Sequence, residues 1–165
     1  MAQRFRGESL NKVDGKGRVS IPAGFRRVIE AGDPNWTEGL RPELVLMWGN
    51  PRTSYVECFT IEAIEEVDRQ IADLQRGSME RRMLERIVNA GSQRVEVDPD
   101  GRLVLPPRAR DKLELTGENA LFLGAGDTFQ IWNPETFAAE EAAMGTWLDT
   151  LGPAVDPFTF LPGRS

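Results

Sequence analysis

An internal repeat limits the possible folds of this chain more than any other feature of its sequence. Residues 13–30 read VDGKGRVSIPAGFRRVIE and residues 97–114 read VDPDGRLVLPPRARDKLE, so the two segments are 84 positions apart. Seven of the eighteen aligned pairs are identical: Val13/Val97, Asp14/Asp98, Gly17/Gly101, Arg18/Arg102, Pro22/Pro106, Arg26/Arg110 and Glu30/Glu114. Such agreement is rare by chance, so the chain is built from two copies of one unit.

Each copy predicts the same order of elements: a strand, a tight turn, a second strand, a short helix and a β-hairpin. The turns are Asp14–Gly17 and Asp98–Gly101, in which glycine supplies the positive φ that tight turns need. A proline ends the strand after each turn, at Pro22 and Pro106. The predicted strands are Arg18–Ile21, Glu43–Trp48 and Tyr55–Phe59 in the first copy, and Arg102–Leu105, Ala120–Leu123 and Thr128–Trp132 in the second.

One copy alone has too few strands to bury a core, because a small sheet leaves unpaired edges and an exposed apolar face. We therefore expect the two copies to close on each other as one compact barrel with a pseudo-twofold axis. The predicted fold class is α+β, mainly β, with flanking helices at Ile61–Gln75, Met79–Asn89 and Pro134–Leu151.

The helix predicted over Met79–Asn89 is amphipathic. Its apolar stripe consists of Met83, Leu84, Ile87 and Val88, and its charged stripe consists of Arg81, Arg82, Glu85 and Arg86. We expect the apolar stripe to be buried and the charged stripe to be solvated, with Ser78 as the N-cap.

The charge of the chain is unevenly distributed. With 20 basic and 26 acidic residues the net charge is −6, which on average disfavours a polyanionic partner. Residues 1–27, however, carry seven basic and two acidic residues, whereas residues 135–165 carry one basic and five acidic residues. This separation indicates an anionic partner for one face of the molecule, although an ordinary fluctuation of surface charge is the simpler explanation.

The composition excludes several classes of function. The chain has no histidine and a single cysteine, Cys58, which removes tetrahedral zinc sites, Cys–His nucleophiles and an internal disulfide, and which fits a reducing cytoplasm. The longest apolar run, Leu44–Trp48, is far shorter than the ~20 residues that span a bilayer, so we expect no membrane partner. We also expect no enzyme activity, no cofactor and no metal, because no nucleophile–base set or cofactor cradle is evident. An enzyme that uses Asp14 or Asp98 with a nearby lysine is an alternative.

The motifs of both copies resemble the MraZ family of bacterial transcriptional regulators. In the first copy the resemblance rests on Phe5-Arg6-Gly7, on the segment from Val13 to Pro22, and on Phe25-Arg26. In the second copy it rests on Val97 to Pro106, on the glycine-containing hairpin at 124–126 and on Phe129 to Trp132. It extends from about Arg4 to Trp147, and the element D-x-x-x-R occurs twice at this spacing.

This resemblance implies an AbrB-like swapped-hairpin fold of the SpoVT-AbrB type, with two repeats in one chain. It also implies a ring-shaped homo-oligomer that represses transcription. Such a ring would bind repeated boxes of double-stranded DNA upstream of the division and cell-wall gene cluster, its own gene included, in the cytoplasm and associated with the nucleoid. We expect one duplicated domain, 1–165, with a DNA-facing repeat at 4–60, a helical connector at 61–91, a second repeat at 92–137, and a C-terminal helix and tail at 138–165.

Three features depart from the family pattern, and the resemblance assigns them no role. They are the Gly32–Pro42 insertion, the acidic and proline-containing C-terminal tail, and the pair Pro99 and Asp100, which replaces the small and basic residues at Gly15 and Lys16. Residues 11–27 carry a net charge of +4, whereas the matching window 95–111 carries −1. Because phosphate contacts require cations, we expect the first hairpin to face DNA and the second to serve as scaffold.

Five basic residues are the candidate DNA contacts: Arg18, Lys16, Arg6, Lys12 and Arg4. Arg18 leads because a planar guanidinium can bind guanine or phosphate through two hydrogen bonds, but an ion pair with Asp14 across the turn is an alternative. Lys16 at the tip of the turn suits a phosphate contact. Five residues are expected to have structural roles in the turns and their ion pairs: Asp14, Gly17, Asp98, Gly101 and Arg102.

Four aromatic residues on predicted strands are expected to be core residues or subunit contacts: Trp48, Trp132, Phe122 and Phe129. A second hypothesis for the whole chain is an oligomeric protein-interaction module without nucleic-acid binding. In that case the acidic surface and the tail would bind a protein partner.

Overall fold

Residues 3–115 and 118–164 are described by the computed structural model of the chain, which divides into two compact units, 1–134 and 135–165. The ends of the expected domain at Met1, Ala2 and Ser165 lie outside the described residues. The first repeat contains β1 (Glu8–Lys12), β2 (Arg18–Ser20), α1 (Ala23–Ala31), β3 (Glu43–Met47) and β4 (Val56–Thr60). The connector contains α2 (Ile61–Ala72), α3 (Met79–Leu84) and the π-helical segment η1 (Glu85–Ala90). The second repeat contains β5 (Ser92–Glu96), β6 (Arg102–Val104), α4 (Pro107–Leu113), β7 (Asn119–Ala125) and β8 (Thr128–Trp132).

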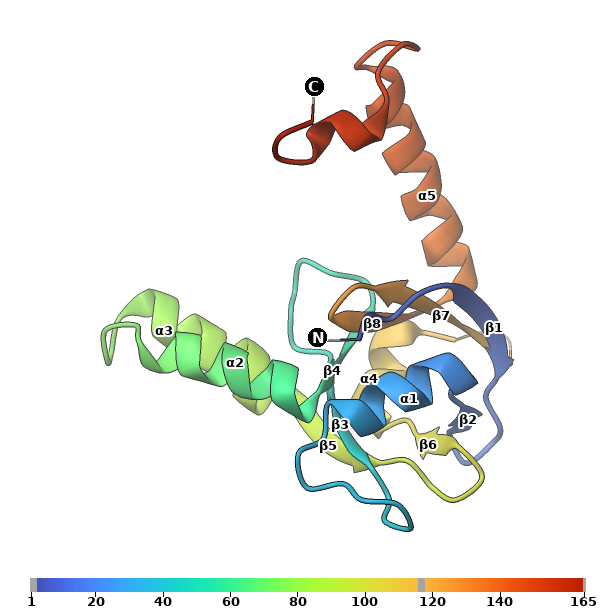
Figure 1. Cartoon of the computed structure of the whole chain (residues 1–165), viewed down its shortest axis with the longest axis vertical. Helices are drawn as coiled ribbons and strands as arrows, with labels where there is room; N and C mark the ends of the chain where they lie inside the picture. The colour runs from blue at the N-terminus through green and yellow to red at the C-terminus, as the bar shows by residue number, and fades with distance from the viewer. Residues whose placement is uncertain (1–2, 116–117, 165) are drawn as a thin grey trace. The chain divides into compact units, whose positions relative to one another are not determined.

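The strands form a six-stranded antiparallel sheet and a separate two-stranded ribbon, β2 with β6 (Figure 1). The order in the large sheet is β1-β7-β8-β4-β3-β5. The first strand of each repeat therefore pairs with the other repeat: β1 lies along β7, with Glu8 opposite Leu123, and β5 lies along β3, with Glu96 opposite Glu43. Each repeat supplies an edge strand to the hairpin of the other.

The expected closed barrel is wrong for the described residues. The large sheet is open, with β1 and β5 as its edges, and the short ribbon is separate from it. Pro22 and Pro106 follow closely after β2 and β6, which are three residues long and too short to join the two edges of the large sheet. The architecture is a mixed α/β fold with a large antiparallel sheet.

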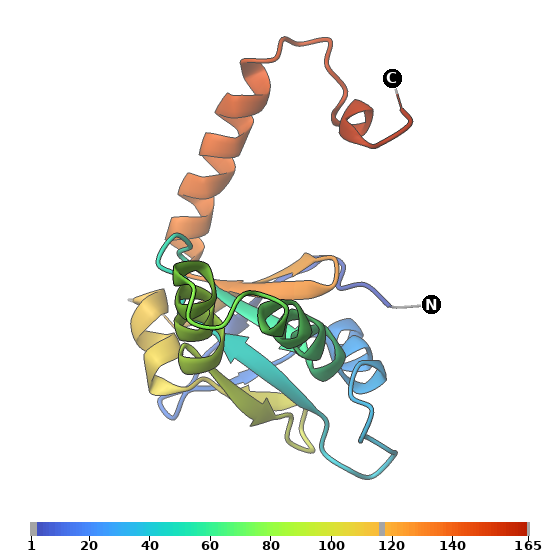
Figure 2. The same ribbon diagram turned by 90° about the vertical axis from the view of Figure 1, so that its left-hand side faces the viewer.

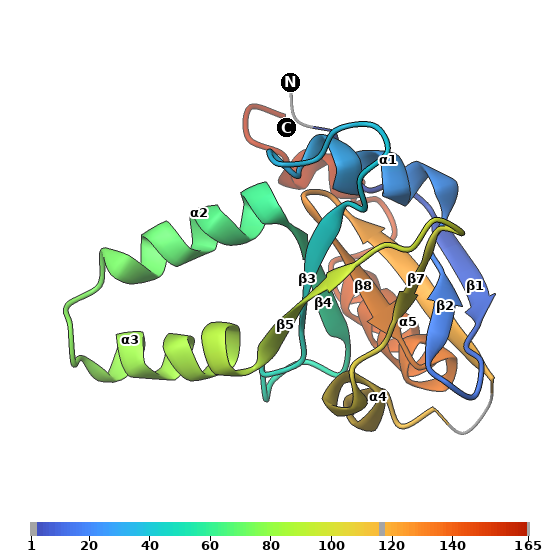
Figure 3. The same cartoon turned by 90° about the horizontal axis from the view of Figure 1, so that it is seen from below.

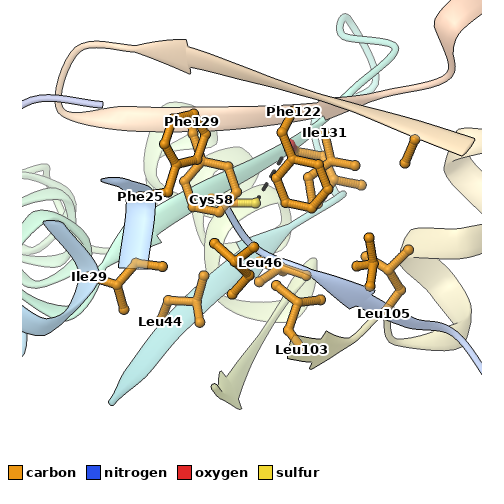
Figure 4. Packing of buried hydrophobic residues seen from close by; sticks show 14 of the residues in the cluster. Phe25, Ile29, Leu44, Leu46, Cys58, Leu103, Leu105, Phe122, Phe129 and Ile131 are labelled. Carbon is orange, nitrogen blue, oxygen red and sulfur yellow. Dashed lines mark hydrogen bonds between the residues drawn. The ribbon is translucent and has the colours of Figure 1, made fainter. Parts of the chain in front are cut away.

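One hydrophobic core is shared by the two repeats, and its side chains point toward one another from helices and strands of both copies (Figure 4). Its largest fully buried side chains include Ile29, Leu44, Leu46, Leu103, Leu105, Leu113, Phe122, Phe129 and Ile131. The ring of Phe5 lies 5.3 Å from that of Phe25 and 5.0 Å from that of Phe129, so the N-terminal segment is held by aromatic packing. Of the aromatic residues expected in the core, Trp132 is also buried, and Trp48 packs against the cluster from its rim.

The helical connector packs against the β3–β4–β5 end of the sheet (Figures 2 and 3). A second cluster of buried apolar residues forms there, with Ile61, Ile64 and Ile71 of α2 and Val88 of η1 against Val45, Met47 and Phe59. Ser78 caps α3 as expected, because its Oγ accepts a hydrogen bond from the backbone N–H of Arg81.

The predicted burial of the apolar and charged stripes over Met79–Asn89 is partly wrong. Met83 and Leu84 are exposed, whereas Ile87 and Val88 pack against the cluster. Arg81 is largely buried instead of solvated, and its Nη1 donates hydrogen bonds to the carbonyls of Ala72 and Leu74. The π-helical segment begins at Glu85, between the two halves of the predicted stripe, and its wider turn takes Ile87 and Val88 out of line with Met83 and Leu84 of α3.

The second unit contains most of α5 (Pro134–Asp149) and the 3₁₀ segment η2 (Pro157–Phe160). None of its described residues, 135–164, is buried. Its exposed apolar residues are Met144, Trp147, Leu151, Phe158, Phe160 and Leu161. In residues 3–115 and 118–164, no helix combines the length and the hydropathy that a membrane span requires.

The close approach of the N-terminal segment to β7 generates a stability prediction. A Cβ atom on Gly124 would lie 2.5 Å from the carbonyl oxygen of Phe5. We expect Gly124→Ala to lower the free energy of unfolding by about 1–3 kcal/mol, because the backbone at Phe5 must move away from the sheet. Urea denaturation of the two proteins measures this difference.

The matched control is Gly24→Ala in α1, where the new Cβ would have no atom within 4 Å. We expect this variant to be as stable as the wild type or slightly more stable, because alanine favours the helix. Equal denaturation midpoints for Gly124→Ala and the wild type would contradict the close approach.

Candidate nucleic-acid interface

The carboxylate of Asp14 organises the first turn, residues 14–17. Its Oδ1 accepts hydrogen bonds from the backbone N–H groups of Lys16 and Arg18, both at 2.9 Å. Its Oδ2 accepts a hydrogen bond from Arg18 Nε at 2.7 Å, which is also the ion pair considered from the sequence. Gly17, with a φ of 81°, closes the turn by donating its N–H to the Asp14 carbonyl. Asp14 therefore fixes both the turn and the arginine side chain.

The ion pair uses one side of the Arg18 guanidinium. Nε is bonded to Asp14, whereas Nη1 and Nη2 have no hydrogen-bond partner within residues 3–115 and 118–164. The side chain is 37% exposed, and the neighbouring Lys16 side chain lies at the exposed tip. The two roles considered for Arg18 are compatible, because the donors that hold the turn differ from the donors that are available to a ligand.

These contacts lower the pKa of the Asp14 carboxyl from 3.8 to about 2. The hydrogen bond from the backbone N–H of Arg18 contributes most, and the bond from the Arg18 guanidinium follows. Desolvation opposes both by raising the pKa. Asp14 is therefore ionised at neutral pH and holds Arg18 by a charged hydrogen bond.

The second turn, residues 98–101, repeats this geometry with a different charge. Asp98 accepts hydrogen bonds from the N–H groups of Asp100 and Arg102 at 2.9 Å and from Arg102 Nε at 3.2 Å. Desolvation raises the pKa of Asp98, but these hydrogen bonds and the charge of Arg102 outweigh it, so the pKa is lowered. Arg102 Nη2 also pairs with Asp100 Oδ2 at 3.3 Å, at the position where the first turn has Lys16. Two carboxylates thus neutralise Arg102.

The register of the β2–β6 ribbon places Arg18 and Arg102 on the same face. Val19 and Leu103 pair at the centre of the ribbon and are each 1% exposed, so the alternate positions point away from the core. On this outward face Arg18 lies opposite Val104, which is 52% exposed, and Arg102 lies opposite Ser20. The tertiary structure brings together the two arginines to which sequence reasoning had assigned separate roles.

Of the other three candidate residues, Lys12 lies in β1, and Arg4 and Arg6 precede it. Lys12, near the first turn, forms an exposed ion pair with Glu118, with 3.3 Å between Nζ and Oε2. Arg4 and Arg6 are exposed beyond the opposite end of β1, on either side of Phe5. At ~3.3 Å per residue, Arg6 and Lys12 lie about 20 Å apart along the chain. The structure therefore groups Lys12 with the turn and leaves Arg4 and Arg6 at a distance from it.

Two arginines that were not candidates lie against the turns. Arg110 of α4 reaches the first turn, where a Cβ on Gly17 would lie 3.1 Å from its Nε and Cζ. Arg26 of α1 reaches the second turn, where a Cβ on Gly101 would lie 1.9 Å from its Nη1. Their identity in both copies was the only signal in the sequence. Charge counts along the chain had placed each arginine with the turn of its own repeat.

Three of the other groups with shifted pKa values lie away from the turns, on or near β4 and α4. Burial raises the pKa of the Cys58 thiol and that of the Glu57 carboxyl, which accepts a hydrogen bond from Thr128 Oγ1 at 3.3 Å. Burial lowers the pKa of Lys112, whose Nζ donates to the carbonyls of Trp48 and Asn50. In the part of the chain that the structure describes, no group of three or more His, Cys, Asp or Glu residues is arranged to hold a metal ion.

These features define a class of protein: an internally duplicated chain in which two repeats exchange strands and present a cationic turn at a ribbon of two strands. A family model described as "MraZ protein, putative antitoxin-like" matches residues 89–144. Curated proteins with the name Transcriptional regulator MraZ match almost the whole chain.

The relative from Ruegeria pomeroyi is 58% identical over 164 residues, which cover 99% of this chain and 98% of the relative. The relative from another Ruegeria species is 57% identical with the same coverage. One from Cereibacter sphaeroides is 47% identical over 167 residues, covering 98% of this chain and 97% of the relative. The chain therefore belongs to the MraZ family of transcriptional regulators, as its motifs indicated, and this family is not a class of enzymes.

The geometry of the first turn generates a titration prediction. We expect the Asp14 carboxyl to titrate near pH 2 in the folded protein, as followed by carboxyl-carbon NMR. Because the folded pKa lies below the ordinary 3.8, the contribution of Asp14 to stability is complete above about pH 4 and is lost as the pH falls through 2.

In the Arg18→Ala variant the guanidinium is absent, but the backbone N–H of residue 18 still donates to Asp14. The titration midpoint should therefore rise and stay below 3.8. A wild-type midpoint of 3.8 would show that Asp14 does not hold the turn.

Proposed function

We propose that this chain is a sequence-specific DNA-binding repressor and that the first turn, with the ribbon face beside it, is its DNA contact. The observation that supports this proposal is the geometry of the Arg18 side chain. Its Nε is hydrogen-bonded to Asp14, whereas Nη1 and Nη2 have no partner among the described residues and can bind a ligand. A guanidinium held in one orientation binds the paired acceptors of guanine at a small entropic cost. The corresponding Arg102 is bonded to two carboxylates and is a poorer ligand for an anion.

The ribbon suits the major groove of duplex DNA, which admits a two-stranded antiparallel ribbon. Its outward face carries Arg18 and Ser20 on β2 and Arg102 and Val104 on β6. In this arrangement Arg18 reads guanine, and the exposed Val104 provides an apolar surface for a thymine methyl group. The second turn then acts mainly as scaffold.

The remaining cations supply contacts to phosphates. Lys16 at the tip of the turn and Lys12 at the end of β1 contact phosphates beside the first turn. The ion pair of Lys12 with Glu118 is exposed and weak, so it competes little with a phosphate. Arg4 and Arg6 contact the duplex farther along its axis. The phosphate contacts of these residues position the protein on the duplex, and the outward face of the ribbon determines which base sequence is bound.

One turn carries too few cations for tight binding, so the proposal includes a homo-oligomeric ring that binds several DNA boxes at once. Linking weak contacts in this way raises the overall affinity without new interactions. As the family resemblance implies, these boxes would lie upstream of the division and cell-wall gene cluster, including the gene for this chain, and the protein would act in the cytoplasm at the nucleoid. The exchange of β1 and β5 between the repeats supports the AbrB-like swapped-hairpin class, and it supports the proposal that the two repeats form one duplicated unit.

Binding to promoter DNA tests the function. We expect the wild-type chain to bind a labelled duplex from upstream of its own gene and to lose affinity steeply as salt increases. Arg18→Ala should weaken binding about tenfold or more, because the guanidinium that donates hydrogen bonds to guanine is lost. Arg102→Ala is the matched control and should have a much smaller effect. Fluorescence anisotropy at several salt concentrations measures all three proteins.

Equal binding by Arg18→Ala and the wild type would refute the assignment of the reading residue. Negligible affinity of the wild type for any duplex would instead favour the protein-interaction module. The observation behind that second candidate is the unit 135–165, which combines net negative charge with exposed aromatic residues such as Trp147 and Phe158. If the chain binds no DNA and a protein partner co-purifies with it through the unit 135–165, the protein-interaction module is the correct function.

A further inference from the structure

The guanidinium of Arg110 lies against the first turn although Arg110 belongs to the second repeat. A Cβ on Gly17 would lie 3.1 Å from its Nε and Cζ and 3.2 Å from its Nη1, so the planar group is packed over the glycine. Arg110 is half-buried, and within residues 3–115 and 118–164 none of its guanidinium N–H donors has a hydrogen-bond partner, whereas its backbone N–H donates to the Pro106 carbonyl. A cation that is partly desolvated and has no acceptor of its own is suited to an anionic ligand.

The tip of the same turn holds two more donors without acceptors among the described residues. The ammonium of Lys16 is exposed and has no ion pair, and the backbone N–H of Gly15 has no hydrogen bond. Asp14, the acidic group of the turn, is already bonded to Arg18. The turn therefore presents a cation from each repeat and a free backbone donor around one small region.

The matched position in the second turn has the same geometry and a different charge. Arg26 packs over Gly101 as Arg110 packs over Gly17. There, however, Asp100 replaces Lys16 and pairs with Arg102, so an approaching phosphate meets a carboxylate. Arg26 and Arg110 thus occupy equivalent positions over the glycines of the two turns. Only Arg110 lies over the turn that has a lysine, Lys16, at its tip.

We infer that Arg110 binds a DNA backbone phosphate together with Lys16, so that the binding surface of the first turn is completed by the second repeat. This inference rests on the proposed function and adds a residue to it. Gly17 is then required for two reasons: its φ of 81° closes the turn, and its missing side chain lets the guanidinium lie against the turn. The contact is to phosphate and carries no sequence information, which separates it from the contact of Arg18.

The test compares Arg110→Ala with Arg26→Ala in anisotropy titrations against a labelled duplex from upstream of the chain's own gene and against a duplex of scrambled sequence. We expect Arg110→Ala to weaken binding to both duplexes about fivefold to tenfold and to reduce the slope of log affinity against log salt by about one. Arg26→Ala should bind as the wild type does. Arg110→Lys should restore the salt slope because it restores the charge.

Arg110→Gln removes the charge and keeps much of the side chain, so it replaces Arg110→Ala if the alanine variant does not fold. Equal losses for Arg110 and Arg26 variants with an unchanged salt slope would show that both arginines only brace the turns. Normal binding by Arg110→Gln, beside a clear loss in Arg18→Ala, would refute this inference and leave the proposed function intact. A wild-type chain that binds neither duplex would overturn both.

Discussion

The fold depends on hydrogen bonds that each tight turn makes with the other repeat. The carbonyl of Gly101 accepts a hydrogen bond from Ile21 N–H at 2.9 Å, and the carbonyl of Gly17 accepts one from Leu105 N–H at 2.8 Å. Between them runs the β2–β6 ladder, which neither repeat can form alone. Because these partners are exchanged, a single repeat would have unpaired strands and an incomplete core, and the two copies fold as one unit.

The two turns have the same geometry but differ in charge. Both turns use an aspartate to hold an arginine by Nε, and both have an arginine from the other repeat packed over the glycine. One difference at the tip, Lys16 against Asp100, decides whether the arginine of the turn keeps its terminal donors or shares them with a second carboxylate. Duplication thus preserved the geometry in both copies, while the charge that suits a polyanion is confined to one.

Sequence reasoning placed tight turns at 14–17 and 98–101, where the structure has them, but assigned the arginines by their place along the chain. Counts over 11–27 and 95–111 placed Arg26 with the first turn and Arg110 with the second, whereas α1 and α4 carry each side chain to the opposite turn. The exchange leaves both totals unchanged, so no count of charges could have revealed it. The stripe expected over Met79–Asn89 was partly wrong for a similar reason, because a π-helical segment interrupts the 3.6-residue period after Leu84.

The sequence by itself determined the duplication, the order of elements and the family, because these depend on local periodicity and on motifs. It also located Asp14 and Arg18 within bonding distance, since both flank one tight turn. Only the tertiary structure decided which strands pair, that the sheet stays open, that Arg18 and Arg102 share one face of the ribbon, and that Arg110 reaches the turn of the other repeat. Strand pairing and the meeting of distant side chains are set by long-range packing, which spacing along a single chain does not encode.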